Sequence, residues 1–397
     1  MDLEYSQEYK DFQQQVRAFA EKHGYQSPRG SAVARPDQQT REWQALLIEN
    51  GYAARTIPRE YGGYGAEPDI LKNVIIAEEL NRAGLNRGLS NQGVTMLVPT
   101  LLEVGTEEQR QKWIRPTLHG EVMWCQGYSE PGAGSDLASL RTSATEDGDD
   151  FIINGHKIWT SSAHVADMMF ILVRTEPDAP KHHGISYLLL SMDTPGIEIQ
   201  PLVSMTGVAE FNEVFFTDVR TPKNQIVGAR GEGWQVANTT LKHERGMLGD
   251  PDRTARQLQG LIDCLKNEKT SGRALMDFPV YRDRVLRLQA RVKAMQYHAM
   301  RVLTCNLKDQ DAGVARLIVK LNATILNNEI CETAIDLLGE TGTLFGDSEY
   351  VRRDGMWQYA YMYSLGLIIG GGTSQIQKNI IAERGLGLPR EPKAKAS

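Results

Sequence analysis

The spacing of the hydrophobic residues changes twice along this chain, and no other feature of the sequence restricts the fold as much. Up to about residue 120, apolar residues recur every three or four positions, as in Phe12, Val16 and Phe19, which is typical of amphipathic helices. From there to about residue 230, short apolar runs are separated by Gly, Pro and Asp, which is typical of strands and turns. Beyond that point the helical spacing returns. The expected strands cover 151–159, 168–174, 185–191, 197–203 and 213–219.

These changes predict an α+β protein of three domains. We expect an N-terminal α-helical domain over 1–120, a middle β-sandwich or barrel domain over 121–230, and a C-terminal four-helix bundle over 231–397. Within the bundle, the apolar spacing is unbroken from Val285 to Val302 and from Val314 to Leu338. Each of these stretches predicts a long helix, whose apolar stripe belongs to the core or to a subunit interface.

Composition argues against several classes of function. The net charge is −6, whereas nucleic-acid surfaces depend on clustered Lys and Arg, so we expect no nucleic-acid partner. The first residues, MDLEYSQEYKDFQQQ, lack the pattern of a secretory signal, and the apolar runs are far too short to span a bilayer. We therefore expect a cytoplasmic protein with no membrane segment. The four cysteines are scattered, which fits a reducing compartment and indicates no metal site.

Three short motifs rich in glycine and hydroxyl residues carry the functional information. They are YSEPGAGSD at 128–136, NGHKIWTS at 154–161 and GGGTSQIQ at 370–377. The motifs and their order, together with the succession of helices, strands and a helical bundle, resemble the acyl-CoA dehydrogenase family. The resemblance extends from about Tyr5 to Pro389, and three motifs in order are far more specific than one.

The resemblance implies that the chain binds FAD. Gly132 and Gly134 let backbone amides approach a ligand closely, and the neighbouring serines add hydroxyl donors. In the family, an indole at the position of Trp159 lies against the flavin. Thr373 and Gln375 match positions that bind the FAD of a neighbouring subunit. The alternatives are an ordinary Gly-rich turn, a tryptophan in the core of the β domain, and a plain loop before a helix. The implied FAD-binding residues are Tyr128, Ser129, Gly134, Ser135, Trp159, Ser161, Thr373 and Gln375.

The resemblance also indicates where the catalytic base lies. Many family members carry a Glu directly before the Gly-Thr-Ser of the third motif, but this chain has Gly371 there, which has no side chain to accept a proton. A minority of the family carries the base on an earlier helix, as a Glu followed by Arg, which matches Glu244 and Arg245. We expect Glu244 to be the base and the Gly371 backbone N–H to bond the thioester carbonyl. The alternative for Glu244 is a solvated helix face.

The implied reaction is the oxidation of an acyl-CoA thioester between its α and β carbons, with electrons passed from FAD to electron-transfer flavoprotein. Ser135 and Arg245 match positions that contact substrate. We expect a homotetramer or homodimer, with a heterotetramer as an alternative. Two other functions stay open: a non-catalytic or FAD-sharing subunit of a heterotetrameric dehydrogenase, and an oxygen-using oxidase or monooxygenase of the same fold.

One segment departs from the family. Residues 267–281 lack the Arg-x-x-Phe-Gly pattern whose Arg reaches a partner's FAD, so Arg273 receives no role. This departure resembles bacterial members that act on branched, cyclic or steroid thioesters. The acyl group itself cannot be read from the sequence.

Overall fold

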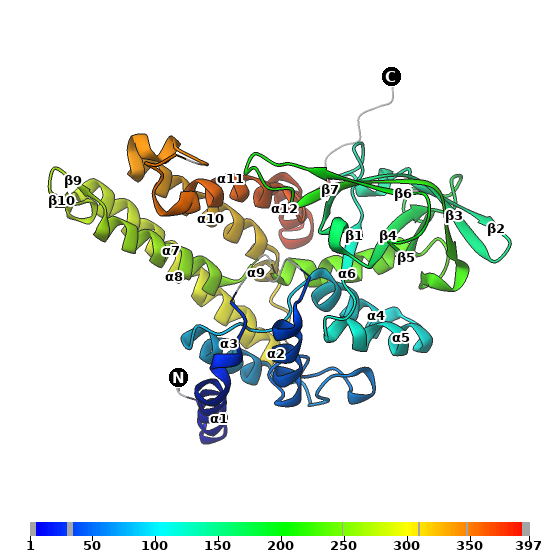
Figure 1. The fold of residues 1–397 in the computed structure, drawn as a ribbon, viewed down its shortest axis with the longest axis horizontal. Helices are drawn as coiled ribbons and strands as arrows, with labels where there is room; N and C mark the ends of the chain where they lie inside the picture. The colour runs from blue at the N-terminus through cyan, green and yellow to red at the C-terminus, as the bar shows by residue number, and fades with distance from the viewer. Residues whose placement is uncertain (1–4, 30–34, 248, 309, 347, 391–397) are drawn as a thin grey trace. The chain divides into compact units, whose positions relative to one another are not determined.

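The computed structural model describes residues 5–29, 35–247, 249–308, 310–346 and 348–390, without the side chains of 244–247. The chain divides into two compact units, residues 1–243 and 244–397, and each is described by itself (Figure 1). Helices form both ends of the chain and a β-sheet the middle, so the expected α+β architecture is confirmed. Among the described residues, no helix combines the length and the apolar character needed to cross a bilayer.

The first three helices form a small core of their own. Its buried residues include Val16, Trp43, Leu47, Ile75 and Leu80, which lie on the apolar faces that the spacing predicts. The hydroxyl of Ser6, the residue before the first helix, makes no capping hydrogen bond. These helices are α1 (Gln7–His23), α2 (Gln38–Glu49) and α3 (Ile70–Arg82).

Two shorter helices, α4 (Val98–Val104) and α5 (Glu107–Leu118), follow a π-helical turn at Gly93–Leu97. A capping box starts α5, because the Thr106 hydroxyl accepts from the Gln109 N–H while the Gln109 side chain accepts from the Thr106 N–H. Both helices pack through their apolar residues against the sheet of the middle segment.

The middle segment forms one mixed sheet with the strand order β6-β7-β3-β2-β4-β5-β8, and β1 pairs in parallel with β4. The five predicted strands correspond to β3, β4, β5, β6 and β7. For most strand ends, the predicted and observed residues differ by no more than two positions. Three strands were not predicted: β1 and β8 are very short, and most of β2 is polar and exposed. The strands are β1 (Trp124–Gly127), β2 (Ser143–Asp147), β3 (Asp150–Ser161), β4 (Met168–Arg174), β5 (Ile185–Ser191), β6 (Ile197–Leu202), β7 (Phe211–Pro222) and β8 (Ile226–Val227).

Strands β4 and β5 are buried on both faces, which explains their continuous apolar sequences. Met169 and Ile171 point into a core between the two parts of the sheet, together with residues of β3 and β7. Phe170 and Leu172 point the other way, into a core shared with α4 and α5. The β segment is therefore a sandwich on one side and a platform for helices on the other.

Two separate helices follow the middle segment. Helix α6 (Gly233–Met247) begins against β5, where a Cβ at Gly233 would come within 2.4 Å of the Ser186 carbonyl carbon, so only glycine fits. Its first half packs into the core of the first unit through Val236 and Ala237. Helix α7 (Pro251–Asn267) then starts anew, with Asp250 as its N-cap.

The second unit contains the predicted helical bundle. Its core combines residues of α7 with those of α8 (Pro279–Leu307), α10 (Val319–Leu338) and α11 (Met356–Ile369). The second long stretch is not one continuous helix as predicted, because α9 (Val314–Leu317) ends at the turn residue Ile318 and α10 begins after it. A short hairpin, β9 (Lys269–Thr270) and β10 (Arg273–Ala274), joins α7 to α8, and α12 (Ser374–Ile380) follows α11.

Candidate active site

The first motif forms a tight turn directly after β1. Glu130 and Ala133 exchange backbone hydrogen bonds of 3.1 and 3.0 Å, which places Pro131 and Gly132 at the tip. Beyond the turn, Gly134 and Ser135 are exposed, and a Cβ built on Gly132 or Gly134 would meet no atom within 4 Å. The backbone of this turn is therefore open to a ligand.

The second motif occupies the end of β3, where a β-bulge displaces its aromatic residue. The pairing with β7 shifts by one residue between Lys157 and Thr160, and within this bulge Trp159 adopts a left-handed backbone with φ 60°. Trp159 is 59% exposed, and its indole lies edge-to-face with the Phe211 ring, with ring centroids 5.9 Å apart. The alternative that Trp159 is a core residue is wrong, because the bulge turns the indole outward.

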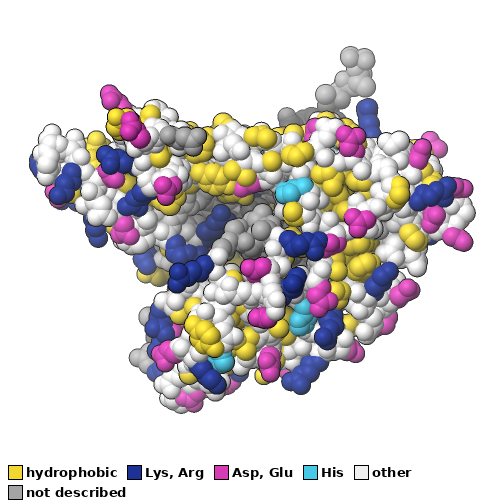
Figure 2. All heavy atoms as spheres, in the orientation of Figure 1, with side chains coloured by type: hydrophobic (Ala, Val, Ile, Leu, Met, Phe, Trp, Pro, Cys, Tyr) yellow, Lys and Arg dark blue, Asp and Glu magenta, His cyan; other side chains and the backbone are white. Residues whose placement is uncertain are grey.

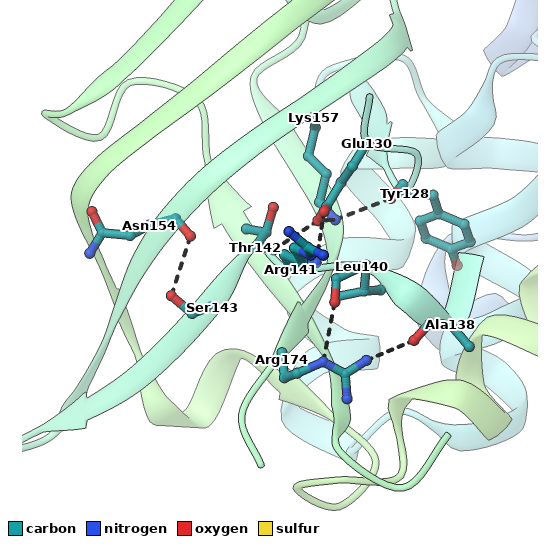
Figure 3. Close-up of polar contacts among 10 residues, drawn as sticks. All are labelled: Tyr128, Glu130, Ala138, Leu140, Arg141, Thr142, Ser143, Asn154, Lys157 and Arg174. Atoms are coloured by element: carbon teal, nitrogen blue, oxygen red, sulfur yellow. Dashed lines mark hydrogen bonds and ion pairs between the residues drawn. The ribbon is translucent and has the colours of Figure 1, made fainter. Parts of the chain in front are cut away.

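Hydrogen bonds join the first motif to the second, and Figure 3 shows those that the Lys157 ammonium donates to Tyr128 and Glu130. The Ile158 N–H donates to the Ser129 carbonyl at 2.9 Å, and the Lys157 ammonium donates to the Tyr128 carbonyl at 3.1 Å. Trp159 follows directly after this contact. The fold thus brings Ser129, Trp159 and Ser161 to one region, although about thirty residues separate the first from the last.

Tyr128 has a different surrounding from the other predicted residues. Its ring is buried and lies edge-on to Phe170 and Tyr187, at centroid distances of 6.0 and 6.3 Å. Any contact of Tyr128 with a cofactor must therefore be made by its backbone.

These residues fit a flavin. An outward-facing indole offers a flat apolar surface for a planar ring, and the half-buried Ser129 and Ser161 offer hydroxyl groups beside it. The open backbone at Gly132 and Gly134 leaves room for the rest of the molecule.

The third motif forms a left-handed glycine turn between α11 and α12. Gly371 and Gly372 have φ values of 64° and 94°, a region that disfavours side chains. The buried Lys320 ammonium donates to the Gly372 carbonyl at 2.7 Å and to the Ile368 carbonyl at 3.2 Å, and Gln377 donates to the Gly371 carbonyl at 3.2 Å. The turn is therefore held from inside the second unit.

The two predicted residues beyond this turn differ in their surroundings. The Thr373 hydroxyl accepts a hydrogen bond from the Ile376 N–H and so caps α12, while Gln375 is exposed. The exposed amide is the one that remains available to a molecule outside this unit.

The helix that carries the predicted base is anchored just before it. The hydroxyls of Thr240 and Thr100 lie 3.0 Å apart, and His243 Nε2 lies 2.9 Å from Glu103 Oε1 of α4. Glu244 comes next, in the last turn of α6. The side chains of Glu244 and Arg245 lie outside the described residues.

Four residues that support the motifs were not singled out from the sequence. Lys157 and Glu130 lie within the first two motifs, and Lys320 and Gln377 hold the glycine turn. A lysine at an inward-facing position of a strand, two residues before an exposed tryptophan, is the signal that identifies Lys157. Arg273 lies on β10, with its guanidinium 4.7 Å from the centre of the Phe278 ring.

Comparison with protein families gives three matches in succession along the chain. The N-terminal, middle and C-terminal domains of acyl-CoA dehydrogenases match residues 6–121, 125–219 and 231–386. The chain belongs to the acyl-CoA dehydrogenase family. Acyl-CoA dehydrogenases are FAD-dependent oxidoreductases, so the resemblance seen in the three motifs is confirmed and the chain is an enzyme of this class.

Several acyl-CoA dehydrogenases are similar over most of their length. The acyl-CoA dehydrogenase IpdE1 of Mycobacterium tuberculosis is 39% identical over 358 residues, which cover 90% of each chain. The short-chain specific mitochondrial enzyme of Homo sapiens is 30% identical over 84% of this chain and 79% of its own.

Two solved structures resemble the fold closely. The Tcur3481-Tcur3483 steroid ACAD has a TM-score of 0.80 at 29% identity, and the match covers 98% of this chain and 100% of that one. The ChsE4-ChsE5 complex of Mycobacterium tuberculosis has a TM-score of 0.81 at 29% identity, with the same coverage.

Proposed function

We propose that this enzyme binds FAD and oxidises an acyl-CoA thioester to the 2-enoyl-CoA, with Glu244 as the base that removes the α-proton. The observation that carries the proposal is the joining of the first two motifs around an outward-facing Trp159 and an open glycine backbone. The left-handed turn at Gly371 adds to it, because a glutamate there would sit in a strained backbone region. The base must then come from elsewhere, and α6 offers Glu244.

The protein has to make a weak carbon acid lose a proton. An ordinary glutamate has a pKa of about 4.3, so Glu244 becomes an effective base only when the bound substrate excludes water from it. The Gly371 N–H stabilises the charge that develops on the thioester oxygen, as an oxyanion-hole donor does. The bound flavin supplies the acceptor for the β-hydride. Electrons then pass to electron-transfer flavoprotein.

A cavity in the first unit suits the charged end of a CoA thioester. It measures about 550 Å³ and lies between the segment after the first motif and the loop after β4. Arg141 and Lys181 contribute positive charge to its lining, and Ser139 and Ser143 contribute hydroxyl groups. Arg174 is engaged with the Ala138 and Leu140 carbonyls and shapes the wall (Figure 3). Phosphate groups favour such a lining.

The acyl group is proposed to be bulky and ring-bearing. A relative of this fold is described as a steroid ACAD, and 267–281 departs from the pattern of the common family members. A second cavity, of about 250 Å³, lies between α8 and α10 beside Gly249, five residues after Glu244. Small and apolar residues, Ala294, Ala299 and Leu326 among them, leave this space open.

The subunit arrangement is proposed from the surface of α11. This helix is apolar all round, yet Met356 and Ile369 at its ends are exposed, and Figure 2 shows hydrophobic side chains gathered over it. Exposed apolar area of this kind is typical of a subunit interface. A tetramer of identical chains, or one with a second kind of chain, would cover it.

The test of the base replaces Glu244 by Gln and mixes the FAD-loaded protein anaerobically with acyl-CoA thioesters. Loss of the base is expected to slow the bleaching of the flavin band by about a thousandfold while FAD stays bound. Glu232→Gln, which changes an exposed glutamate just before α6, is the control and is expected to react like wild type. Undiminished bleaching in Glu244→Gln would reject Glu244 as the base.

A second candidate function is an FAD-sharing subunit of a heteromeric dehydrogenase. Gly371, the missing arginine pattern and the likeness to the ChsE4-ChsE5 complex favour it. Expression of the chain alone distinguishes the two. Stoichiometric FAD and turnover without a partner would exclude the second candidate, whereas FAD binding only after addition of a second chain would support it.

A further inference from the structure

A buried ion pair lies behind the flavin motifs, and the proposed chemistry does not account for it. Lys157 is fully buried on β3, and its ammonium lies 2.8 Å from the Glu130 carboxylate (Figure 3). We propose that Lys157 and Glu130 are positioning residues that set the electrostatic field at the flavin, acting through the peptide bond between Tyr128 and Ser129. This inference rests on the proposed binding of FAD at the first two motifs.

The pair ties together three segments of the first unit. The Glu130 carboxylate accepts from Lys157 and also from the backbone N–H groups of Arg141 and Thr142, at 2.7 and 2.8 Å. The Lys157 ammonium donates to the Tyr128 carbonyl as well. The turn of the first motif, the strand of the second and the segment before β2 therefore meet at one point.

Packing alone does not explain an ion pair at this place. Taking two charges out of water costs several kcal/mol for each ion, and well-packed apolar residues of similar volume often stabilise a protein as well or better. Burial lowers the pKa of Lys157 to about 8, which leaves the ammonium charged at neutral pH. Burial alone would raise the pKa of Glu130, but Lys157, Thr142 and Arg141 outweigh it and hold the carboxyl ionised. We therefore infer that this buried ion pair serves the function of the enzyme and not only its folding.

The geometry gives the two charges different neighbours. The ammonium points at the Tyr128 carbonyl, so it polarises the peptide whose N–H belongs to Ser129 and strengthens that N–H as a donor. Among the described residues, no acceptor bonds the Ser129 N–H, while the Ile158 N–H fixes its carbonyl at 2.9 Å. The carboxylate instead faces the backbone of 141–142. The positive end of the pair is therefore the end joined to the flavin motifs.

This orientation predicts a sign for each charge. A positive field favours the negative charge that arrives with the hydride, so Lys157 raises the flavin reduction potential and Glu130 lowers it. Loss of a purely structural contact would act differently, because removing either partner would loosen the same loop and weaken FAD binding in both variants.

The experiment measures the reduction potential of the FAD-loaded protein by equilibration with a reference dye, and the FAD affinity of the apoprotein by titration. The variants are Lys157→Met, Glu130→Gln and the double variant. Relative to wild type, we expect the ratio of reduced to oxidised flavin at a fixed potential to fall at least tenfold in Lys157→Met, equal to about 30 mV for a two-electron couple. It should rise in Glu130→Gln, and the double variant should lie between wild type and Lys157→Met.

The double variant keeps the test decisive if a single variant fails to fold, because it leaves no unpaired buried charge. A potential equal to that of wild type in the double variant, or shifts of the same sign in both single variants, would overturn the proposal. Failure of wild type to bind FAD would instead reject the proposed function on which it rests. The two failures are therefore distinguishable without any measurement of turnover.

Discussion

Trp159 is the residue whose local structure is hardest to explain by folding alone. A bulky residue with φ 60° occupies a strained backbone region, at a cost of about 1–3 kcal/mol. Its indole recovers little of this by burial, since it is 59% exposed. The fold therefore maintains a strained, outward-facing aromatic ring beside Ser161, which is what a stacking surface for a planar ligand requires.

Trp159→Ala separates ligand binding from folding. Because the indole is exposed, we expect the free energy of unfolding of the apoprotein to change by no more than about 0.5 kcal/mol. Loss of stacking should weaken FAD binding by about tenfold or more. Titration of the apoprotein with FAD measures this. The control is Tyr25→Ala, an aromatic residue that is 83% exposed, and it should leave FAD affinity unchanged. Equal affinities in all three proteins would contradict the assignment.

The buried Lys320 ammonium holds the glycine turn in place. Replacing it by Met removes both hydrogen bonds that the ammonium gives to Gly372 and Ile368, and leaves their carbonyls unpaired. The Gly371 N–H should then lose its fixed direction, so we expect the turnover number to fall by at least about tenfold, as for a weakened oxyanion donor, with FAD binding retained. Steady-state kinetics measure the effect. Lys293→Met, an exposed lysine of α8, should behave like wild type.

At the scale of elements, the strands and long helices could be predicted because their patterns are strong. β4 and β5 are continuous apolar runs bounded by turns, and their predicted and observed ends coincide. The bulge at Trp159 could not be predicted, since one extra residue within β3 leaves no mark on an alternating pattern. The start of α7 at Gly249-Asp250-Pro251 carries a readable signal, a cap followed by proline, which the apolar spacing alone does not reveal.

The packing of α1 against α3 includes a carboxylate whose charge we expect to stabilise the first unit. Glu79 is buried, and it accepts hydrogen bonds from Arg17 at 2.8 and 3.0 Å and from Arg82 at 2.8 Å. Burial alone would raise the pKa of Glu79, but the hydrogen bonds from Arg17 and Arg82 outweigh it and lower the pKa below its ordinary value. The ionised form thus favours the folded state.

Glu79→Gln is expected to destabilise the protein by about 1 kcal/mol at neutral pH, a modest figure because both arginines are partly exposed. The lowered pKa means that the contribution is complete above the ordinary glutamate pKa and is lost as the pH falls through the folded value. The difference in melting temperature between wild type and Glu79→Gln should therefore shrink as the pH drops below about 4.3. Glu49→Gln, on the exposed end of α2, is the control. A difference that stays constant down to pH 3 would contradict this reading.

At the scale of the whole molecule, the three motifs lie far apart in the sequence: the first two meet in the first unit, and the glycine turn belongs to the second. Their identity and order could be recognised from the sequence, and so could the displacement of the base from Gly371 to Glu244 as an expectation. The residues that hold the motifs in place could not, because Lys157 and Lys320 gain their roles only from contacts with backbone carbonyls of distant segments. The identity of the acyl group could not be predicted from the sequence either. The walls of a cavity combine residues of several elements, as in the space between α8 and α10.

The subunit composition belongs to this scale as well. We propose that the exposed apolar surface of α11 is a subunit interface, which either identical or different subunits would cover. Light scattering on the purified chain, before and after addition of candidate partner chains, measures which of the two assemblies forms.

The central claim is that this enzyme removes two hydrogens from the α and β carbons of an acyl-CoA thioester. The most direct measurement mixes the FAD-loaded protein anaerobically with straight-chain, branched and ring-bearing CoA thioesters, and follows both the flavin band and the mass of the thioester. We predict that ring-bearing thioesters bleach the flavin and are recovered two hydrogens lighter, and that electron-transfer flavoprotein restores the colour. A flavin that stays oxidised with every thioester, or a bleached flavin beside a thioester of unchanged mass, would contradict the account.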